Sequence, residues 1–210
     1  MLRLCATTIS PSNCSPDARP PVKQGIVERD FPPSIEFRER SAIDSRGHAH
    51  GNLVVHGDGT RERQMWGPES ADGPPRMTTV LARRYQCQRC GTCMLMVPGE
   101  VLRRRLYTAP AIGLALALWA LLGVTVSGVR ARVSPLRVLG AAAAGRWATL
   151  RRWARDTIDG RLFSTWRVAP DNFTLRNHAE RAAAMLRALG PSALPVADAV
   201  FAGAARHRSA

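Results

Sequence analysis

The chain has 210 residues, 45% of them apolar, and a formal net charge of +14, which fits one domain or two small ones. Residues 1–76 hold ten basic and ten acidic side chains, whereas residues 77–210 hold twenty arginines against six acids. This imbalance predicts a polyanionic partner such as DNA, RNA or an anionic membrane surface. The odd count of five cysteines, three of them clustered, excludes a small secreted fold held together by disulfides.

The first part of the chain shows few signals of regular structure. Residues 1–40 are rich in proline, serine and mixed charge, and we expect them to be disordered. They lack the apolar core of a secretory signal, so we expect a reducing, cytoplasmic location. Glycine and proline turn signals follow in residues 41–80, with short strand candidates at 52–56 and 61–66 between them.

A cysteine pair on a short turn is the most informative motif. It lies in Arg83-Arg84-Tyr85-Gln86-Cys87-Gln88-Arg89-Cys90-Gly91. Residues 77–85 read as a strand before the turn, and residues 94–97 as a strand after it. Two thiolates at this spacing point their sulfurs at one spot, which suits tetrahedral Zn²⁺. The sequence therefore predicts a zinc-ribbon-like β unit over residues 41–105.

A structural zinc site needs four ligands, and the cysteine pair supplies two. A third cysteine follows after three residues and needs a tight extra turn, and histidines lie upstream where the first half of a ribbon belongs. The candidate ligands are Cys87, Cys90, Cys93, His48 and His50, with His56 next best. The alternative is that the histidines are ordinary loop residues on a ribbon that has lost its metal. A thioredoxin-like redox use is not predicted, because no βαβ pattern surrounds the pair.

The rest of the chain reads as helical. Four helices are predicted before the tail, over residues 109–122, 125–133, 136–144 and 146–159. Gly123 and Gly160 end the first and last of them, and Ser134-Pro135 reads as a helix start with a hydroxyl cap and proline at the first position. Residues 106–162 form a predicted helix-turn-helix-like domain. Residues 163–210 form a tail with one amphipathic helix over 176–189.

The last of these four helices carries the basic signal. At 100° per residue, Trp147, Leu150, Trp153, Ala154 and Ile158 share one arc, and arginines occupy the neighbouring arc. We expect the apolar arc to pack on other helices and the arginines to meet phosphates or base edges. A solvated basic face is the alternative. The candidate nucleic-acid-binding residues are Arg130, Arg132, Arg137, Arg146, Arg151, Arg152 and Arg155.

These features together resemble the zinc-ribbon plus helix-turn-helix module of bacterial insertion-sequence transposases, which also occurs as short stand-alone proteins. The resemblance rests on four stretches: the cysteine motif over residues 83–91, Arg105-Leu106-Tyr107-Thr108-Ala109-Pro110-Ala111-Ile112, Val129-Arg130-Ala131-Arg132-Val133-Ser134-Pro135, and Thr149-Leu150-Arg151-Arg152-Trp153. The chain departs from the module at residues 41–45, where Ser-Ala-Ile-Asp-Ser replaces the expected first Cys-x-x-Cys. The resemblance implies DNA as partner, zinc as cofactor, and association with a transposase or with itself.

The sequence thus predicts an α+β protein that binds DNA without catalysis. After residue 160 the only acids are Asp171, Glu180 and Asp198, and no strand-rich sequence of adequate length surrounds them to form a metal-dependent nuclease domain. No nucleophile elbow, P-loop or zinc-protease helix is present in the sequence, and no small-molecule substrate is expected. The alternative is a single-pass membrane protein, because residues 106–129 form an uncharged run of spanning length. Its alanine and glycine content, and the basic residues at both ends, favour a buried helix instead.

Overall fold

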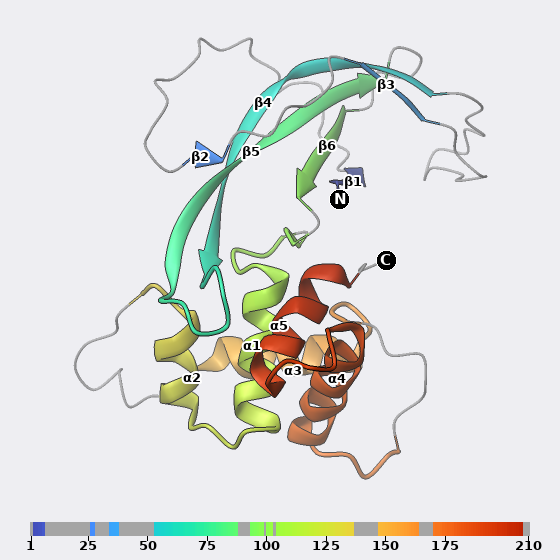
Figure 1. Cartoon of the computed structure of the whole chain (residues 1–210). Coiled ribbons are helices and arrows are strands. Elements are labelled where there is room, and N and C mark those ends of the chain that lie inside the picture. The colour runs from blue at the N-terminus through green and yellow to red at the C-terminus, as the bar shows by residue number, and fades with distance from the viewer. Residues whose placement is uncertain are drawn as a thin grey trace. The chain divides into compact units, whose positions relative to one another are not determined.

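The computed structural model of the chain describes residues 2–6, 26–27, 34–37, 53–87, 93–98, 100–102, 104–136, 147–163 and 170–207. These residues form an α+β structure of strands followed by five helices, which confirms the predicted class (Figure 1). They divide into two compact units. The sheet unit contains residues 1–63 and 79–98, and the helical unit contains residues 64–78 and 99–210.

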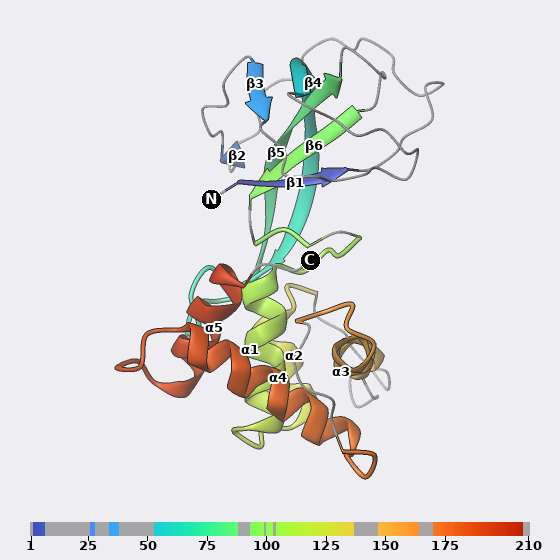
Figure 2. The ribbon, with the colours of Figure 1, turned by 90° about the vertical axis from the view of Figure 1, so that its right-hand side faces the viewer.

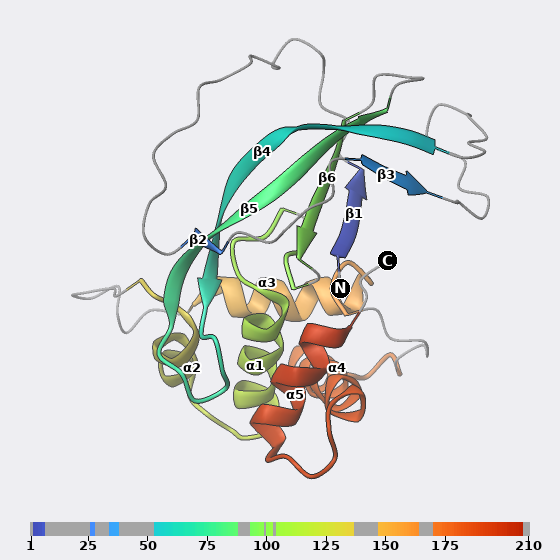
Figure 3. The same ribbon diagram turned by 45° about the horizontal axis from the view of Figure 1, so that its top comes forward.

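The sheet is built on two long strands, β4 (Leu53–Gly67) and β5 (Arg76–Cys87), with β6 (Cys93–Pro98) beside β5 (Figure 3). β5 and β6 pair antiparallel, with Gln86 opposite Cys93 and Arg83 opposite Met96, which confirms the predicted strands on either side of the cysteine turn. The two short strands predicted at 52–56 and 61–66 are one strand. Gly59 lies within it at φ +77°, a conformation glycine adopts without strain, so the strand continues through this residue instead of turning back.

Three short strands come from the first forty residues. β1 (Leu2–Ala6) pairs antiparallel with β6, β3 (Ser34–Phe37) pairs antiparallel with β4, and β2 (Ile26–Val27) pairs parallel with β5. Disorder was expected here, and for these three stretches the structure differs. Leu2 and Leu4 alternate with other residues, as strand residues do, but such short alternations gain their stability from a partner far along the chain. The remaining residues of this region lie outside the described part.

The helical unit is organised around α1 (Ala109–Ala120), whose residues are all buried except Trp119. Thr108 caps the helix by accepting a hydrogen bond from the Ala111 amide, and Gly123 at φ +69° turns the chain out of it. α2 (Val126–Val133) follows with Thr125 as its cap. The uncharged run at 106–129 is thus divided between two helices. Among the described residues, no helix has the length and apolar character needed to cross a membrane.

Three more helices pack around α1: α3 (Ala148–Ile158), α4 (Leu175–Leu189) and α5 (Val196–Arg206). Figure 2 shows α5 and α3 on different sides of α1. α3 and α4 agree with the predicted helices at 146–159 and 176–189, whereas α5 was not predicted. Close packing explains its place, because a Cβ added at Gly203 would lie 1.8 Å from the Leu186 carbonyl oxygen. Only glycine allows α5 to approach α4 so closely.

The helix predicted to begin at Ser134-Pro135 does not begin there. Ser134 instead follows the last residue of α2, and neither Pro135 nor Leu136 is helical. The Ser134 hydroxyl serves the core: its Oγ accepts hydrogen bonds from the Tyr107 hydroxyl at 2.9 Å and from the Leu136 amide at 3.3 Å. The rest of the predicted helix, residues 137–144, lies outside the described residues.

Candidate nucleic-acid interface

α3 has one buried face and one exposed basic face. Leu150 and Ala154 have no exposed surface and Trp153 is 2% exposed. The next positions around the helix are exposed: Arg151, Arg152 and Arg155. The helical spacing of apolar residues and arginines in the sequence predicted this division into a packed face and a basic face. We refer to the three arginines below as the basic face.

The predicted apolar arc was wrong at one end of α3. Ile158 was expected in the core but is 49% exposed, and it is the last residue of α3. Asp156 and Thr157 are buried in its place, at 5% and 6% exposed. The Thr157 hydroxyl donates a hydrogen bond of 2.7 Å to the Ala154 carbonyl oxygen, so its burial leaves no hydroxyl unsatisfied.

The basic face is not neutralised by the described part of the chain. No acidic side chain among those residues forms an ion pair with Arg151, Arg152 or Arg155. Arg151 and Arg155 are four residues apart, so their side chains neighbour each other on the helix surface. Like charges at this spacing repel, and an anion bound between them relieves the repulsion. As far as the described residues go, the face can therefore accept phosphate groups without first breaking an ion pair.

A cluster of four aromatic rings holds α3 against the unit. Tyr107 contacts Trp66 at 5.4 Å, Trp147 at 6.1 Å and Trp153 at 4.9 Å between ring centroids, all edge to face. Trp147 and Trp153 also contact each other at 5.1 Å. Edge-to-face pairs add stability beyond the burial of their area. Burial raises the pKa of Tyr107, while its hydrogen bond to Ser134 and the nearby charge of Arg130 act in the opposite direction.

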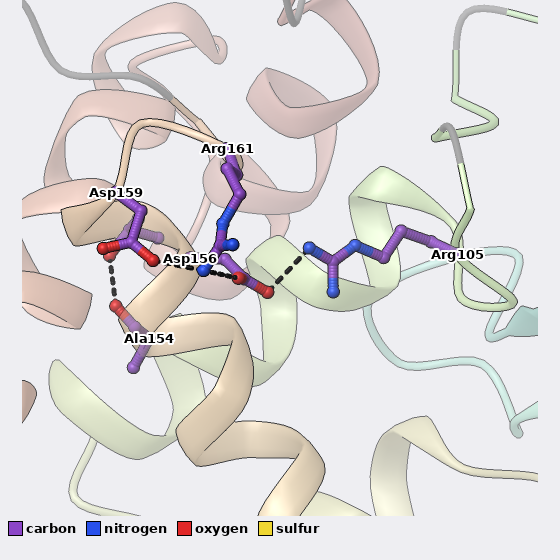
Figure 4. A network of polar contacts seen from close by, with 6 residues as sticks. Arg105, Ala154, Asp156, Asp159 and Arg161 are labelled. Atoms are coloured by element: carbon purple, nitrogen blue, oxygen red, sulfur yellow. Dashed lines mark hydrogen bonds and ion pairs between the residues drawn. The ribbon is translucent and has the colours of Figure 1, made fainter.

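A buried carboxylate secures the end of α3 (Figure 4). Asp156 is approached by Arg105 Nη2 at 2.6 Å and by Arg161 Nη2 at 3.2 Å, each on a different carboxylate oxygen. Arg161 also pairs with Asp159. Sequence reasoning did not single out these residues. The sequence offered one signal, Asp156 itself: it is the only acid in α3, and the other residues of this helix are mostly basic or apolar.

The other predicted nucleic-acid-binding arginines have different surroundings. Arg132 Nη2 donates to the Ala71 carbonyl oxygen and to Asp72 Oδ1, both at 3.0 Å, so this cation holds the turn at residues 71–72. Arg130 is partly buried, and its Nε forms no hydrogen bond within the described residues. Arg137 and Arg146 lie outside them. The basic face of α3 is therefore the group of predicted arginines that the structure brings together on one open surface.

The predicted zinc ligands lie mostly beyond what the structure describes. Cys90, His48 and His50 are outside the described residues, as is the side chain of Cys87, whose backbone ends β5. His56, the next best candidate, is exposed. In the portion of the chain that is described, no three His, Cys, Asp or Glu side chains are grouped so that they could hold a metal ion.

Apart from His56, Cys93 is the one candidate ligand whose side chain is described. Its Sγ lies 3.7 Å from Asp58 Oδ2 and 3.8 Å from Arg84 Nη2, and these two partners form an ion pair of 2.8 Å. The guanidinium and the carboxylate lie at nearly equal distances from the sulfur, so their charges largely offset each other there. Cys93 thus belongs to this ion-pair cluster, and its role as a third zinc ligand stays a prediction.

Comparison with models of protein families gives no match, and comparison with curated proteins and with solved structures gives no significant match. The site is therefore described by its own geometry: an exposed basic helix face, an aromatic cluster behind it and a buried carboxylate at its end. The resemblance to a transposase module remains a prediction from sequence.

Proposed function

We propose that the helical unit binds duplex DNA through the basic face of α3, and that the protein is a non-catalytic DNA-binding protein. One observation carries this proposal. Arg151, Arg152 and Arg155 are exposed on one side of a helix whose other side is fixed in the core, and no described acid pairs with them. The excess of twenty arginines over six acids in residues 77–210 supports the same conclusion.

The dimensions of an α-helix suit this partner. A helix with its side chains is about 10–12 Å across, and the major groove of B-form DNA is about 12 Å wide. Guanidinium groups pair with phosphate oxygens through two parallel hydrogen bonds, and arginine also recognises guanine edges in the groove. Phosphate contacts would supply most of the affinity, and base contacts would supply any preference for a sequence.

The proposal includes a zinc-braced turn at Cys87 and Cys90. The support is the hairpin, in which β5 ends at Cys87 and β6 begins at Cys93, so that the turn containing the pair joins two paired strands. Zinc bound there would brace the loop and would carry no chemistry of its own. The resemblance adds a transposase, or a second copy of this chain, as a protein partner.

Salt-dependent binding tests the proposal. We would follow the fluorescence anisotropy of a labelled duplex of about 20 base pairs, two helical turns, from about 50 to 300 mM KCl. The variant Arg151→Gln/Arg152→Gln/Arg155→Gln should bind more weakly, and its salt slope should fall by about one unit for each phosphate that the variant no longer neutralises.

A control variant distinguishes DNA binding by the basic face from DNA binding by the net positive charge of the protein. Arg176, Arg187 and Arg206 are exposed arginines on α4 and α5, and changing all three to glutamine removes the same charge. This control should retain most of the salt slope, because its arginines belong to α4 and α5 and not to the proposed face of α3. Equal losses in the two triple variants would show that DNA responds to net charge alone and would refute the assignment to α3.

A further inference from the structure

Asp156 is the buried charge of α3. Its side chain is 6% exposed, whereas the cations of the same helix are exposed. A carboxylate removed from water is costly unless it is paired and hydrogen-bonded, and here each oxygen faces its own guanidinium. Figure 4 shows Arg105 and Arg161 reaching the carboxylate from different segments of the chain.

The two partners connect α3 to the segment before α1. Arg105 precedes α1 by a few residues and is 51 positions away from Asp156 in sequence, whereas Arg161 lies just beyond the end of α3, after Asp159 and Gly160. Arg104 has φ +58°, a conformation that a side-chain-bearing residue keeps only where its surroundings enforce it. The ion pair with Arg105 is one such constraint on this loop.

We propose that Asp156 is a positioning residue for DNA binding. The aromatic contacts of Trp153 fix the middle of α3, and the ion pairs of Asp156 fix the rotation of its last turn. Arg155 belongs to that turn, so its direction depends on the carboxylate beside it. This inference rests on the proposed function, because it concerns how the basic face is aimed.

Charge alone predicts the opposite effect. Removing an acid from a basic surface makes the surface more positive and strengthens binding to a polyanion. Asp159 provides the matched comparison: it lies three residues further on, is 48% exposed, and also pairs with Arg161. Asp156→Asn and Asp159→Asn change the net charge equally, so a difference in the direction of their effects reports position instead of charge.

The experiment measures the binding of the labelled duplex over the same salt series for the whole protein and both asparagine variants. We expect Asp156→Asn to weaken binding about tenfold, the effect of removing one phosphate interaction, with a salt slope lower by about one unit. Asp159→Asn should bind within about twofold of the parent or more tightly. Near-ultraviolet circular dichroism of the tryptophans, measured under the same conditions, establishes that each variant is folded.

A second variant keeps the test decisive if Asp156→Asn does not fold. Arg105→Gln leaves Arg161 to pair with the carboxylate, and its matched control is Arg206→Gln, which removes one exposed arginine from α5. Arg105→Gln should weaken binding severalfold more than this control. Equal binding of Asp156→Asn and Asp159→Asn, or of Arg105→Gln and Arg206→Gln, overturns the inference alone. A parent protein that binds no duplex overturns the proposed function, and the inference with it.

Discussion

α1 and α3 are helices of nearly equal length, twelve and eleven residues, that the helical unit uses in opposite ways. α1 carries no charged residue and is buried except at Trp119, and α2, α3, α4 and α5 pack around it. α3 buries one side and exposes its arginines on the other. The comparison teaches that the fully buried helix organises the fold, whereas the half-buried helix leaves a surface for a partner.

The largest expected effect tests the two faces of α3 against each other. Trp153→Ala removes a 2% exposed ring that contacts Tyr107 and Trp147, so it should lower the free energy of unfolding by roughly 3–5 kcal/mol. Chemical denaturation followed by tryptophan fluorescence or circular dichroism measures this loss. Arg152→Ala, one residue away on the exposed face, should change it by less than about 0.5 kcal/mol. Similar losses in the two variants would mean that α3 does not have distinct faces.

A smaller effect tests whether α1 is buried on every side. Gly113 and Ala115 point to nearly opposite sides of the helix, and both are buried. A Cβ at Gly113 would lie 2.8 Å from the Ala204 Cβ, so Gly113→Val should overpack the contact with α5. We expect Gly113→Val and Ala115→Val each to destabilise by about 1–3 kcal/mol in thermal or chemical unfolding. A neutral Ala115→Val would reveal an open face on α1.

Sequence reasoning succeeded where local signals decide the outcome. The uncharged run and Gly123 gave the burial and the end of α1, and the spacing of α3 gave its exposed arginines. It failed where distant residues decide the outcome. α5 depends on the approach of Gly203 to Leu186, and β1 and β3 depend on strands far along the chain.

The candidate site shows the same difference between residues that local patterns predict and residues whose role depends on distant contacts. Its arginines follow from helical periodicity, but the burial of Asp156 follows from Arg105, which is 51 positions away. No pattern in a single sequence indicates such a pairing. The role of Ser134 was likewise hidden, because Ser-Pro is typical of a helix start and the hydrogen bond from Tyr107 is a tertiary contact. The predicted zinc ligands other than Cys93 and His56 lie where the structure describes no side chains, so zinc binding stays a prediction.

A third prediction concerns the hydroxyl behind α3. Tyr107→Phe removes the 2.9 Å hydrogen bond to Ser134 and should cost about 1 kcal/mol at neutral pH. Burial raises the pKa of Tyr107 above its unfolded value of 10.0, so the folded state favours the protonated form. The corresponding stability is present below that unfolded pKa and is lost as the pH rises through the folded pKa.

Unfolding measured against pH checks this sign. The parent should lose stability more steeply than Tyr107→Phe above about pH 10, since only the parent must ionise this buried phenol on unfolding. Tyr85 is also buried with a raised pKa, and it contributes equally to both proteins, so the difference between the two curves isolates Tyr107. Parallel curves would contradict the assignment.

The smallest expected change in the free energy of unfolding is at Ile158, an apolar residue that is exposed on α3 although the leucines of α1 are buried. An apolar residue on the predicted core arc would cost roughly 2–5 kcal/mol to truncate if it were buried, as every leucine of α1 is. Ile158 is 49% exposed, so Ile158→Gln should change the free energy of unfolding by less than about 0.5 kcal/mol. Glutamine also favours a helix slightly more than isoleucine does, which offsets the small decrease in apolar contact. A loss above about 1 kcal/mol in chemical denaturation would place Ile158 in the core and would extend the buried face of α3 to the end of the helix, as α1 is buried along its length.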